Sequence, residues 1–152
     1  MNIVLVAPLI PQNTGAIGRL CVCTDTHLHL IKPLGFIIDD AHIKRAGMDY
    51  WQHLDVTVHE SWEDFIASES PQDLHFLSTK GEKSLYDIEF TENSYLVFGN
   101  ESIGLPPDFY SSYKDQLFLI PMPGRYNRSH NLANSVSIAL YEGLRQTEFS
   151  KS

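Results

Sequence analysis

The chain has 152 residues, of which 43% are hydrophobic and 20% charged, as expected of a folded domain that buries one core. No stretch approaches the roughly 20 apolar residues of a membrane span, and the apolar start at residues 1–10 lacks a basic leader and contains Pro8, which disfavours a secretory signal. The formal net charge of −8 argues against a nucleic-acid surface spread over the whole molecule, because phosphate contacts supply most of the affinity for RNA or DNA.

The first half of the chain alternates strands with helices. Short apolar runs predict the strands, and in the third predicted helix Ser61 takes the N-cap position with Asp64 three residues later. The predicted elements are a strand at 2–6, a turn with Pro8, Pro11 and Asn13-Thr14-Gly15, a helix from about 16 to 24, a strand at 27–31, a helix at 39–46, a strand at 56–59 and the helix after Ser61.

The second half predicts strands at 75–78, 95–98 and 116–120, followed by a helix on which Leu132, Val136, Leu140 and Leu144 recur every four residues. Ser129 or Asn131 could cap this helix. The alternation predicts a single α/β domain over residues 1–152, with a mostly parallel sheet and helices on both faces.

Charge and cysteine distribution refine the overall composition. Residues 39–115 hold 16 of the 19 acidic residues and five bases, whereas the two ends together carry six bases and three acids. A local basic patch for a polyanion is therefore compatible with the acidic total, and so is an ordinary solvated surface. Cys21 and Cys23 would lie on different helix faces, so we interpret both as reduced core thiols of a cytoplasmic protein.

Three polar segments follow predicted strands, at the sheet edge where open α/β folds bind ligands. The first is Pro11 to Arg19, for which a plain β-α turn is the alternative interpretation. The second is Phe98 to Pro106, a loop bounded by glycines. The third begins with Ile120-Pro121-Met122 and continues through Arg125 and Arg128 into Ser129-His130-Asn131-Leu132, a run richer in amides and hydroxyls than capping requires.

Together these segments resemble the three motifs of the SPOUT superfamily of methyltransferases, and within it the small TrmL (YibK-like) proteins that methylate ribose at the wobble position of tRNA. The resemblance covers essentially the whole chain, in the family's order and spacing. It is carried by Asn13-x-Gly15 with Arg19, by the loop 99–105, and by Ile120-Pro121-Met122 with Ser129-x-Asn131-Leu132. One position departs from the pattern, because His130 stands where many members carry leucine.

The resemblance implies S-adenosylmethionine as cofactor, tRNA as substrate, a deep C-terminal trefoil knot and a homodimer, with Tyr141 expected at the dimer contact. It makes Arg19 the catalytic residue. Because arginine is almost always protonated, we expect Arg19 to stabilise the developing alkoxide rather than to remove a proton, and the base stays open. The implied cofactor-binding residues are Leu77, Ser78, Thr79, Gly99, Asn100, Glu101, Gly104, Ile120, Pro121, Met122, Ser129, Asn131 and Leu132.

Candidates for holding the RNA are Asn13, Lys44, Arg45, Arg125 and Arg128, and for each basic residue a solvated surface charge is the competing interpretation. Most of the aromatic residues, Trp51 and Trp62 among them, are expected in the core or an interface.

Other functions receive less support. The glycines do not form a Rossmann fingerprint, and the hydrolase elbow fails because Asn100 replaces the glycine before Ser102. We expect no metal, because His27 and His29 share a strand face without an evident carboxylate cluster. A noncatalytic RNA-binding module with the same fold remains an alternative, and a serine hydrolase using Ser129 or Ser102 is a weaker one.

Overall fold

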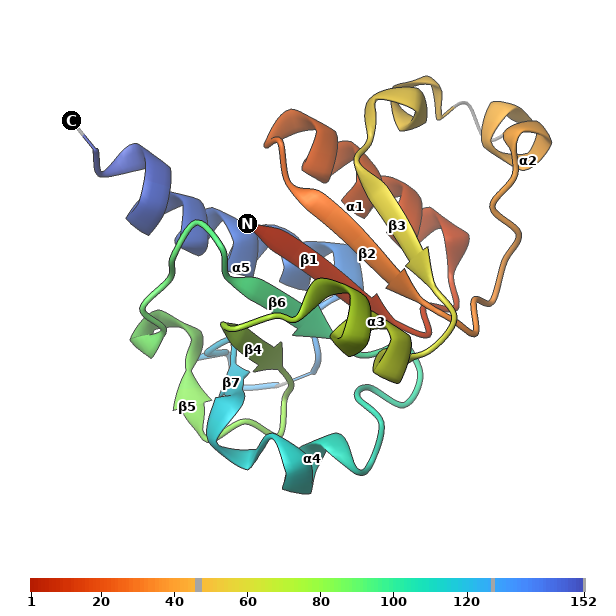
Figure 1. The fold of residues 1–152 in the computed structure, drawn as a ribbon. Helices are drawn as coiled ribbons and strands as arrows, with labels where there is room; N and C mark the ends of the chain where they lie inside the picture. The colour runs from red at the N-terminus through yellow and green to blue at the C-terminus, as the bar shows by residue number, and fades with distance from the viewer. Residues whose placement is uncertain (46–47, 127, 152) are drawn as a thin grey trace.

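A computed structural model describes residues 1–45, 48–126 and 128–151, with the side chains of Asp40, Ile43 and Lys44 outside the description. Within these residues one seven-stranded sheet has the order β3-β2-β1-β6-β4-β7-β5, and all neighbouring strands run parallel (Figure 1). The strands are β1 (Asn2–Val6), β2 (His27–Ile31), β3 (Val56–His59), β4 (Leu74–Leu77), β5 (Lys83–Ser84), β6 (Tyr95–Phe98) and β7 (Leu117–Leu119).

Helices cover both faces of the sheet, as predicted. Helices α1 and α5 pack side by side on one face and α3 covers the other (Figure 1). The α-helices are α1 (Pro11–Cys23), α2 (Asp40–Arg45), α3 (Trp62–Glu69), α4 (Phe109–Ser112) and α5 (Leu132–Leu144). Short 3-10 turns span Asp49–His53, Leu85–Asp87 and Lys114–Gln116, and a π-helical turn over Arg145–Phe149 extends α5. None of the helices in the described ranges is long and apolar enough to cross a bilayer.

Helix α1 begins at Pro11, five residues earlier than the sequence predicted, and this corrects the interpretation of Asn13-Thr14-Gly15 as a turn. Proline suits the first helical position, where its missing N–H has no intrahelical partner to lose. Gly18 on this helix allows close packing against Trp51. A Cβ on Gly18 would stand 2.8 Å from the Trp51 ring, so the bare backbone admits the turn Asp49–His53 against α1.

Two predicted caps can be checked directly. Ser61 Oγ accepts a hydrogen bond from the Asp64 N–H at 3.1 Å, which confirms the start of α3. Of the two candidates for capping α5, the structure selects Asn131, whose Oδ1 accepts from the Asn134 N–H at 3.2 Å. Both ends are thereby fixed by short-range hydrogen bonds.

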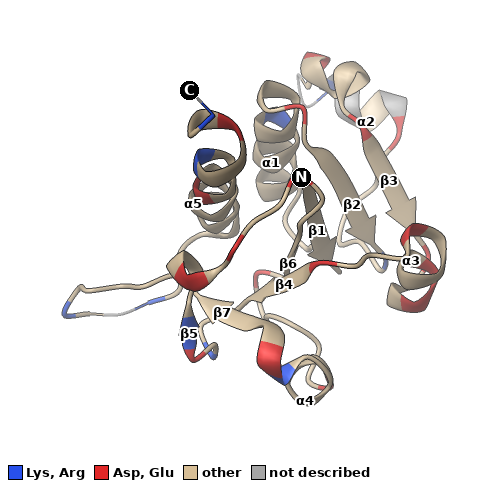
Figure 2. Ribbon diagram, turned by 60° about the vertical axis from the view of Figure 1, so that its left-hand side comes forward, with Lys and Arg blue, Asp and Glu red and all other residues tan. Residues whose placement is uncertain are grey.

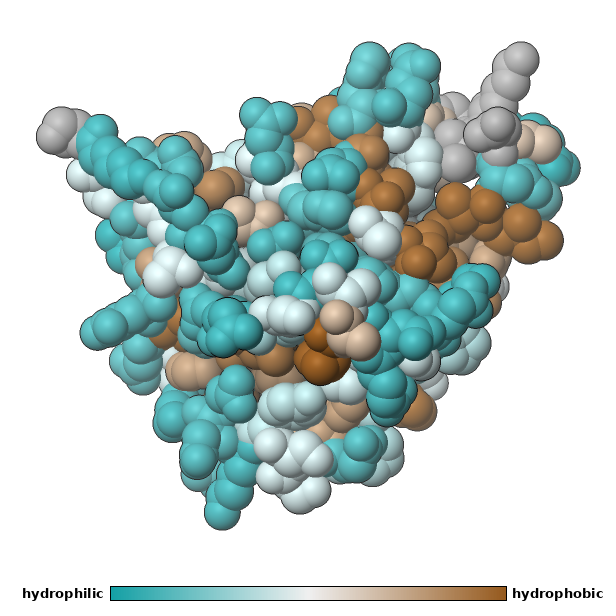
Figure 3. Space-filling view, in the orientation of Figure 1, coloured by the Kyte–Doolittle hydropathy of each residue, from teal (hydrophilic) through white to brown (hydrophobic). Residues whose placement is uncertain are grey.

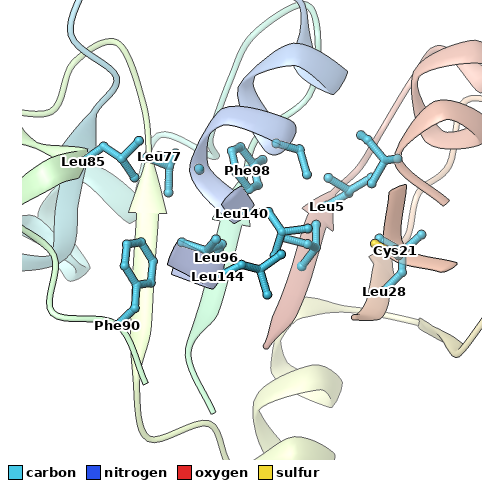
Figure 4. Packing of buried hydrophobic residues seen from close by; sticks show 14 of the residues in the cluster. Leu5, Cys21, Leu28, Leu77, Leu85, Phe90, Leu96, Phe98, Leu140 and Leu144 are labelled. Carbon is cyan, nitrogen blue, oxygen red and sulfur yellow. The ribbon is translucent and has the colours of Figure 1, made fainter. Parts of the chain in front are cut away.

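The larger core cluster lies between the sheet and the pair α1 and α5. Leu140 and Leu144 of α5 pack on Leu96 and Phe98 of β6, beside Leu5 (Figure 4). The four-residue spacing of leucines on α5 therefore marks the face that meets the sheet, as its periodicity indicated.

The two cysteines differ in environment. Cys21 is buried in this core, and burial raises the pKa of its thiol to about 12. Cys23 is exposed, so its expected place in the core was wrong, while both cysteines are free as predicted. The two-residue spacing placed them on different faces of α1, only one of which meets the sheet.

The segment between β2 and α2 exposes apolar side chains. Ile37 is exposed, and Leu34, Phe36 and Ile38 beside it are half-buried, which produces a brown patch over this segment (Figure 3). An exposed apolar patch of this kind is typical of a contact site.

Candidate functional site

A pocket of about 490 Å³ lies at the carboxyl ends of β4, β6 and β7. This volume falls in the usual range for small-molecule sites. The second and third segments, which follow β6 and β7, form much of its wall, and the first segment contributes Asn13. Residues from several separate parts of the chain therefore converge on one cavity, as expected for the carboxyl edge of an open α/β sheet.

Most of the residues predicted to bind cofactor line this pocket. They are Leu77, Ser78, Thr79, Gly99, Asn100, Glu101, Gly104, Ile120, Met122, Ser129, Asn131 and Leu132, whereas Pro121 is not among the described lining residues. The pocket is also lined by residues outside the predicted cofactor-binding set, namely Phe98, Ser102, Ile103 and Leu105 of the second segment, His130 of the third, Ser135 on α5, and Ile10, Lys80 and Tyr110, which no predicted segment includes. The apolar members of both sets give the pocket hydrophobic walls, which suit an aromatic ring system.

The loop after β6 closes on itself through backbone contacts that require glycine. Asn100 and Gly104 exchange two backbone hydrogen bonds of 3.1 Å each. A Cβ on Gly99 would lie 2.0 Å from the carbonyl carbon of Gly104, and Gly104 itself has φ of +75°. Asn100 Oδ1 also accepts from the N–H groups of Ser102 (3.0 Å) and Ile103 (2.7 Å), so its side chain holds the loop in shape.

Glu101 joins this loop to the start of α1. One oxygen of its carboxylate accepts from the Leu9 N–H at 3.0 Å and the other accepts from the Ile10 N–H. A carboxylate at the N-terminus of a helix also meets the positive end of the helix dipole. Both oxygens of Glu101 therefore accept hydrogen bonds within the protein, which weakens the prediction that Glu101 contacts the cofactor directly.

A second link joins α1 to α5 at the pocket. Asn131 Nδ2 donates to Asn13 Oδ1 at 2.9 Å, while Asn131 Oδ1 caps α5. Asn13 is only 8% exposed. Its predicted role in RNA contact is therefore weakened, because its carboxamide oxygen fixes Asn131 instead.

The part of the pocket wall that follows β4, with Tyr110 of α4 beside it, carries hydroxyl groups. Ser78 Oγ lies 3.3 Å from the hydroxyl of Tyr110 and accepts from the Lys80 N–H at 3.1 Å. Lys80 Nζ lies 4.8 Å from the centre of the Tyr110 ring. This part of the wall thus offers the hydroxyl groups of Ser78 and Tyr110 and a cation beside an aromatic ring.

Arg19 is exposed and is not among the described residues that line the pocket. It lies six residues beyond Asn13 on α1, or about 9 Å along the helix axis. Within one chain, the proposed catalytic guanidinium and the pocket are therefore separate features.

The other predicted basic residues are dispersed. Arg125 and Arg128 are exposed on the segment between β7 and α5, which projects from the body of the molecule and carries blue at its outer part (Figure 2). Arg45 is exposed at the end of α2, and the side chain of Lys44 lies outside the described residues. Tyr126, between the two arginines, is 89% exposed.

A histidine network lies away from the pocket, on the sheet face beneath α3, and consists of His29, His59 and Glu69. His29 Nδ1 lies 3.0 Å from His59 Nε2, and Glu69 Oε1 lies 3.9 and 4.0 Å from these two nitrogens. The sequence predicted no metal because no carboxylate was evident beside the strand histidines. Glu69 supplies such a carboxylate, so this reason for the prediction does not hold.

The nitrogens of this network already contact one another. His29 Nε2 lies 3.3 Å from Asn2 Oδ1 and its Nδ1 faces His59, so both nitrogens of its ring have partners. Burial, followed by the neighbouring His27 and His59, lowers the pKa of His29 to about 3 and keeps its ring neutral. We assign the network a structural role, in which hydrogen bonds join β1, β2 and β3.

A serine nucleophile receives no support from the geometry. In the described part of the chain, neither Ser102 Oγ nor Ser129 Oγ is hydrogen-bonded to a histidine, although His130 follows Ser129. Nucleophilic catalysis by serine depends on a base within hydrogen-bond reach.

The sequence matches the SpoU rRNA Methylase family over residues 1–141, and the chain belongs to this family. This finding confirms the resemblance inferred from the three segments. A tRNA (cytidine(34)-2'-O)-methyltransferase from Saccharophagus degradans is 45% identical, and the match covers 99% of this chain and 98% of the relative.

Two solved structures extend the comparison. A structure described as giving insight into the 2-OH methylation of C/U34 on tRNA has a TM-score of 0.84 and 43% identity, covering 95% of this chain and 94% of the other. The SpoU methyltransferase AviRb from Streptomyces viridochromogenes, in complex with AdoMet, has a TM-score of 0.78 and 25% identity over 96% of this chain and 60% of the other.

Proposed function

We propose that this protein is an S-adenosylmethionine-dependent tRNA methyltransferase that methylates the ribose 2'-hydroxyl of the wobble nucleotide, cytidine or uridine 34. The observation that carries the proposal is the convergence of the second and third motif segments, with Asn13 of the first, on one pocket at the sheet edge. The near full-length similarity to a tRNA (cytidine(34)-2'-O)-methyltransferase supports the choice of substrate.

The pocket fits the methyl donor on structural grounds. Gly99 leaves no room for a Cβ, and the loop 99–105 that it begins lines the pocket. Apolar side chains such as Leu77 and Leu132 offer surfaces for an adenine ring, while the hydroxyl of Ser78 and the amide of Asn131 offer polar contacts. S-adenosylmethionine would supply an already activated methyl group, so the chain has chiefly to bind and orient.

The proposed role of Arg19 is electrostatic. Before its oxygen can accept the methyl group that S-adenosylmethionine would supply, the ribose 2'-hydroxyl must give its proton to a base other than Arg19, and negative charge would develop on the oxygen as that proton leaves. A protonated guanidinium stabilises that charge and can hold a neighbouring phosphate. It cannot itself accept the proton.

The position of Arg19 supports a homodimer. Because Arg19 is exposed and does not line its own pocket, we propose that it acts at the pocket of a second copy of the chain. Tyr141 on α5 is 48% exposed, and its ring centre lies 6.1 Å from that of the exposed Phe149. This aromatic pair is a candidate for the contact between the two copies.

The tRNA backbone would be held by exposed cations. Arg125 and Arg128 on the projecting segment and Arg45 on α2 are exposed, and Lys44 is a further candidate from sequence. Such contacts position a nucleic acid without reading its bases. A single domain over residues 1–152, a cytoplasmic location and a trefoil knot near the C-terminus complete the proposal.

The test is methyl transfer from labelled S-adenosylmethionine to purified tRNA by wild type, Arg19→Ala and, as control, Arg145→Ala, whose exposed guanidinium pairs with Glu142. We expect Arg19→Ala to lose at least 100-fold in kcat and to keep its affinity for S-adenosylmethionine within a few-fold. Arg145→Ala should behave as wild type.

A mixing experiment tests the proposed exchange between copies. Arg19→Ala and Gly99→Ala should each be inactive alone, yet a mixed dimer should regain activity at the one pocket that has an intact loop and an arginine from the other copy. No recovery in verified mixed dimers would contradict action across the dimer. Wild type that binds tRNA and never methylates it would favour the noncatalytic RNA-binding module.

A further inference from the structure

The segment between β7 and α5 differs in charge from the rest of the chain. Residues 116–141 contain no Asp or Glu and two arginines, in a protein whose net charge is −8. Both arginines are exposed, and the segment that carries them projects from the body of the molecule (Figure 2). An acid-free projecting segment in an acidic protein is a local surface for a polyanion.

Tyr126 lies between these arginines and is more exposed than any other large hydrophobic residue of the described chain. It is 89% exposed, compared with 70% for Ile103 and 63% for Ile37. An aromatic ring that is left in water, flanked by Arg125 and Arg128, contributes little to the core. Its ring faces are available for stacking.

The same segment ends in the pocket. Ser129, His130 and Asn131 line it, and Ser129 is three residues from Tyr126. Three residues of fully extended chain span at most about 11 Å. The exposed ring therefore lies close to the place where the reacting nucleotide would enter.

We propose that Tyr126 stacks on an unpaired base of the substrate RNA next to the methylated nucleotide, while Arg125 and Arg128 contact the flanking phosphates. This inference rests on the proposed function and adds the residue that holds the RNA loop open. Proteins that bind single-stranded RNA commonly combine aromatic stacking with a cationic groove. The arginines favour RNA over a protein partner as the occupant.

The experiment compares wild type with Tyr126→Ala, Tyr126→Phe and the control Tyr86→Ala, in which an exposed tyrosine at another site is removed. Tyr126→Ala should raise KM for tRNA about tenfold, with kcat and S-adenosylmethionine affinity within twofold of wild type. Tyr126→Phe keeps the ring and should restore wild-type KM. Tyr86→Ala should leave KM unchanged.

A second measurement identifies the stacked base and the phosphate contacts. An anticodon stem–loop with 2-aminopurine at successive loop positions should change fluorescence on binding wild type at one position, and this change should disappear with Tyr126→Ala. Arg125→Ala and Arg128→Ala should each reduce the salt dependence of RNA binding, log Kd against log salt, by about 1.

The outcomes separate this inference from the proposed function. If wild type methylates tRNA and Tyr126→Ala has unchanged KM, stacking is wrong and the enzyme stands. If wild type binds the stem–loop without turnover and Tyr126→Ala loses that binding, stacking stands. Tyr126→Phe as weak as Tyr126→Ala would overturn stacking, since the hydroxyl would then be the contact. Dimer dissociation by Tyr126→Ala with unchanged RNA affinity would overturn it in favour of a protein contact.

Discussion

The pocket and the histidine network both bring polar groups together at the sheet, but the polar groups differ in type and in burial. The pocket is formed at strand ends by loop backbone, glycines and neutral amides, with half-buried or exposed residues such as Asn100 and Ser129. The histidine network is formed on the sheet face by side chains of His29 and His59, which are 0% and 6% exposed, with the half-buried Glu69.

This difference separates a site for a ligand from a site for stability. Both ring nitrogens of His29 already have partners within the protein, His59 and Asn2, and are not free to bind a ligand. The pocket places its fixed groups around open volume. Changes in the network should therefore lower stability and spare cofactor affinity, whereas changes in the pocket loop should do the reverse.

The largest expected effect comes from Phe65→Ala beside the histidine network. Phe65 is fully buried, with its ring centre 5.4 Å from that of His29 and 5.2 Å from that of His59. We expect the free energy of unfolding to fall by about 3–5 kcal/mol, measured by urea denaturation, with unchanged S-adenosylmethionine affinity in the folded fraction.

The control for this prediction is Tyr86→Ala, because Tyr86 is 56% exposed and its loss should lower the free energy of unfolding by under about 0.5 kcal/mol. If Phe65→Ala does not fold, Phe65→Leu should still show a smaller loss in the same direction. If Phe65→Ala and Tyr86→Ala lower the free energy of unfolding equally, the region around the histidine network has no special role in stability.

A smaller free-energy effect, confined to binding, is expected for Gly99→Ala. Its Cβ would overlap the Gly104 backbone at 2.0 Å, so the loop must move out of the pocket wall. We expect the calorimetric Kd for S-adenosylmethionine to rise about 100-fold, or about 2.7 kcal/mol. The matched control is Gly124→Ala, where a Cβ meets nothing within 4 Å. Equal Kd values for Gly99→Ala and Gly124→Ala would contradict the proposal that the loop 99–105 binds the cofactor.

The smallest effect is expected for Asn131→Ala, which sharpens the comparison because this residue serves both stability and the pocket. Loss of the α5 cap should cost about 1 kcal/mol in unfolding free energy, and loss of the 2.9 Å bond to Asn13 should weaken S-adenosylmethionine binding a few-fold. Asn134→Ala, one helical turn later and exposed, should change neither quantity. Unfolding and calorimetry on both variants give the two numbers.

Local patterns predicted the fold well where the signal is short-range. The strands at 2–6, 27–31, 56–59 and 95–98 match the observed bounds of β1, β2, β3 and β6, because continuous apolar runs of this length fit buried parallel strands. The caps Ser61 and Asn131 follow from side chains that bond a backbone N–H three residues away. The two-residue strand β5 carried too little pattern to be found.

The candidate site was partly predictable for a different reason. The three polar segments can be recognised in the sequence directly. Because parallel strands bring their carboxyl ends to one edge of the sheet, the convergence of the segments that follow these strands could be expected. The clamp of Glu101 on the Leu9 and Ile10 N–H groups, and the link from Asn131 to Asn13, join residues about 90 and 118 positions apart. No local pattern encodes such pairs.

The amino-acid sequence by itself determined the alternating strand and helix order, the family and the residues available for chemistry, because periodicity, caps and motif spacing are properties of neighbouring residues. Only the tertiary structure decided which of those residues face one pocket, that Arg19 stands outside the pocket of its own chain, and that Glu69 accompanies His29 and His59. Those outcomes depend on how the packed sheet and helices place side chains from distant segments in space, and that placement follows from the burial of the whole core at once.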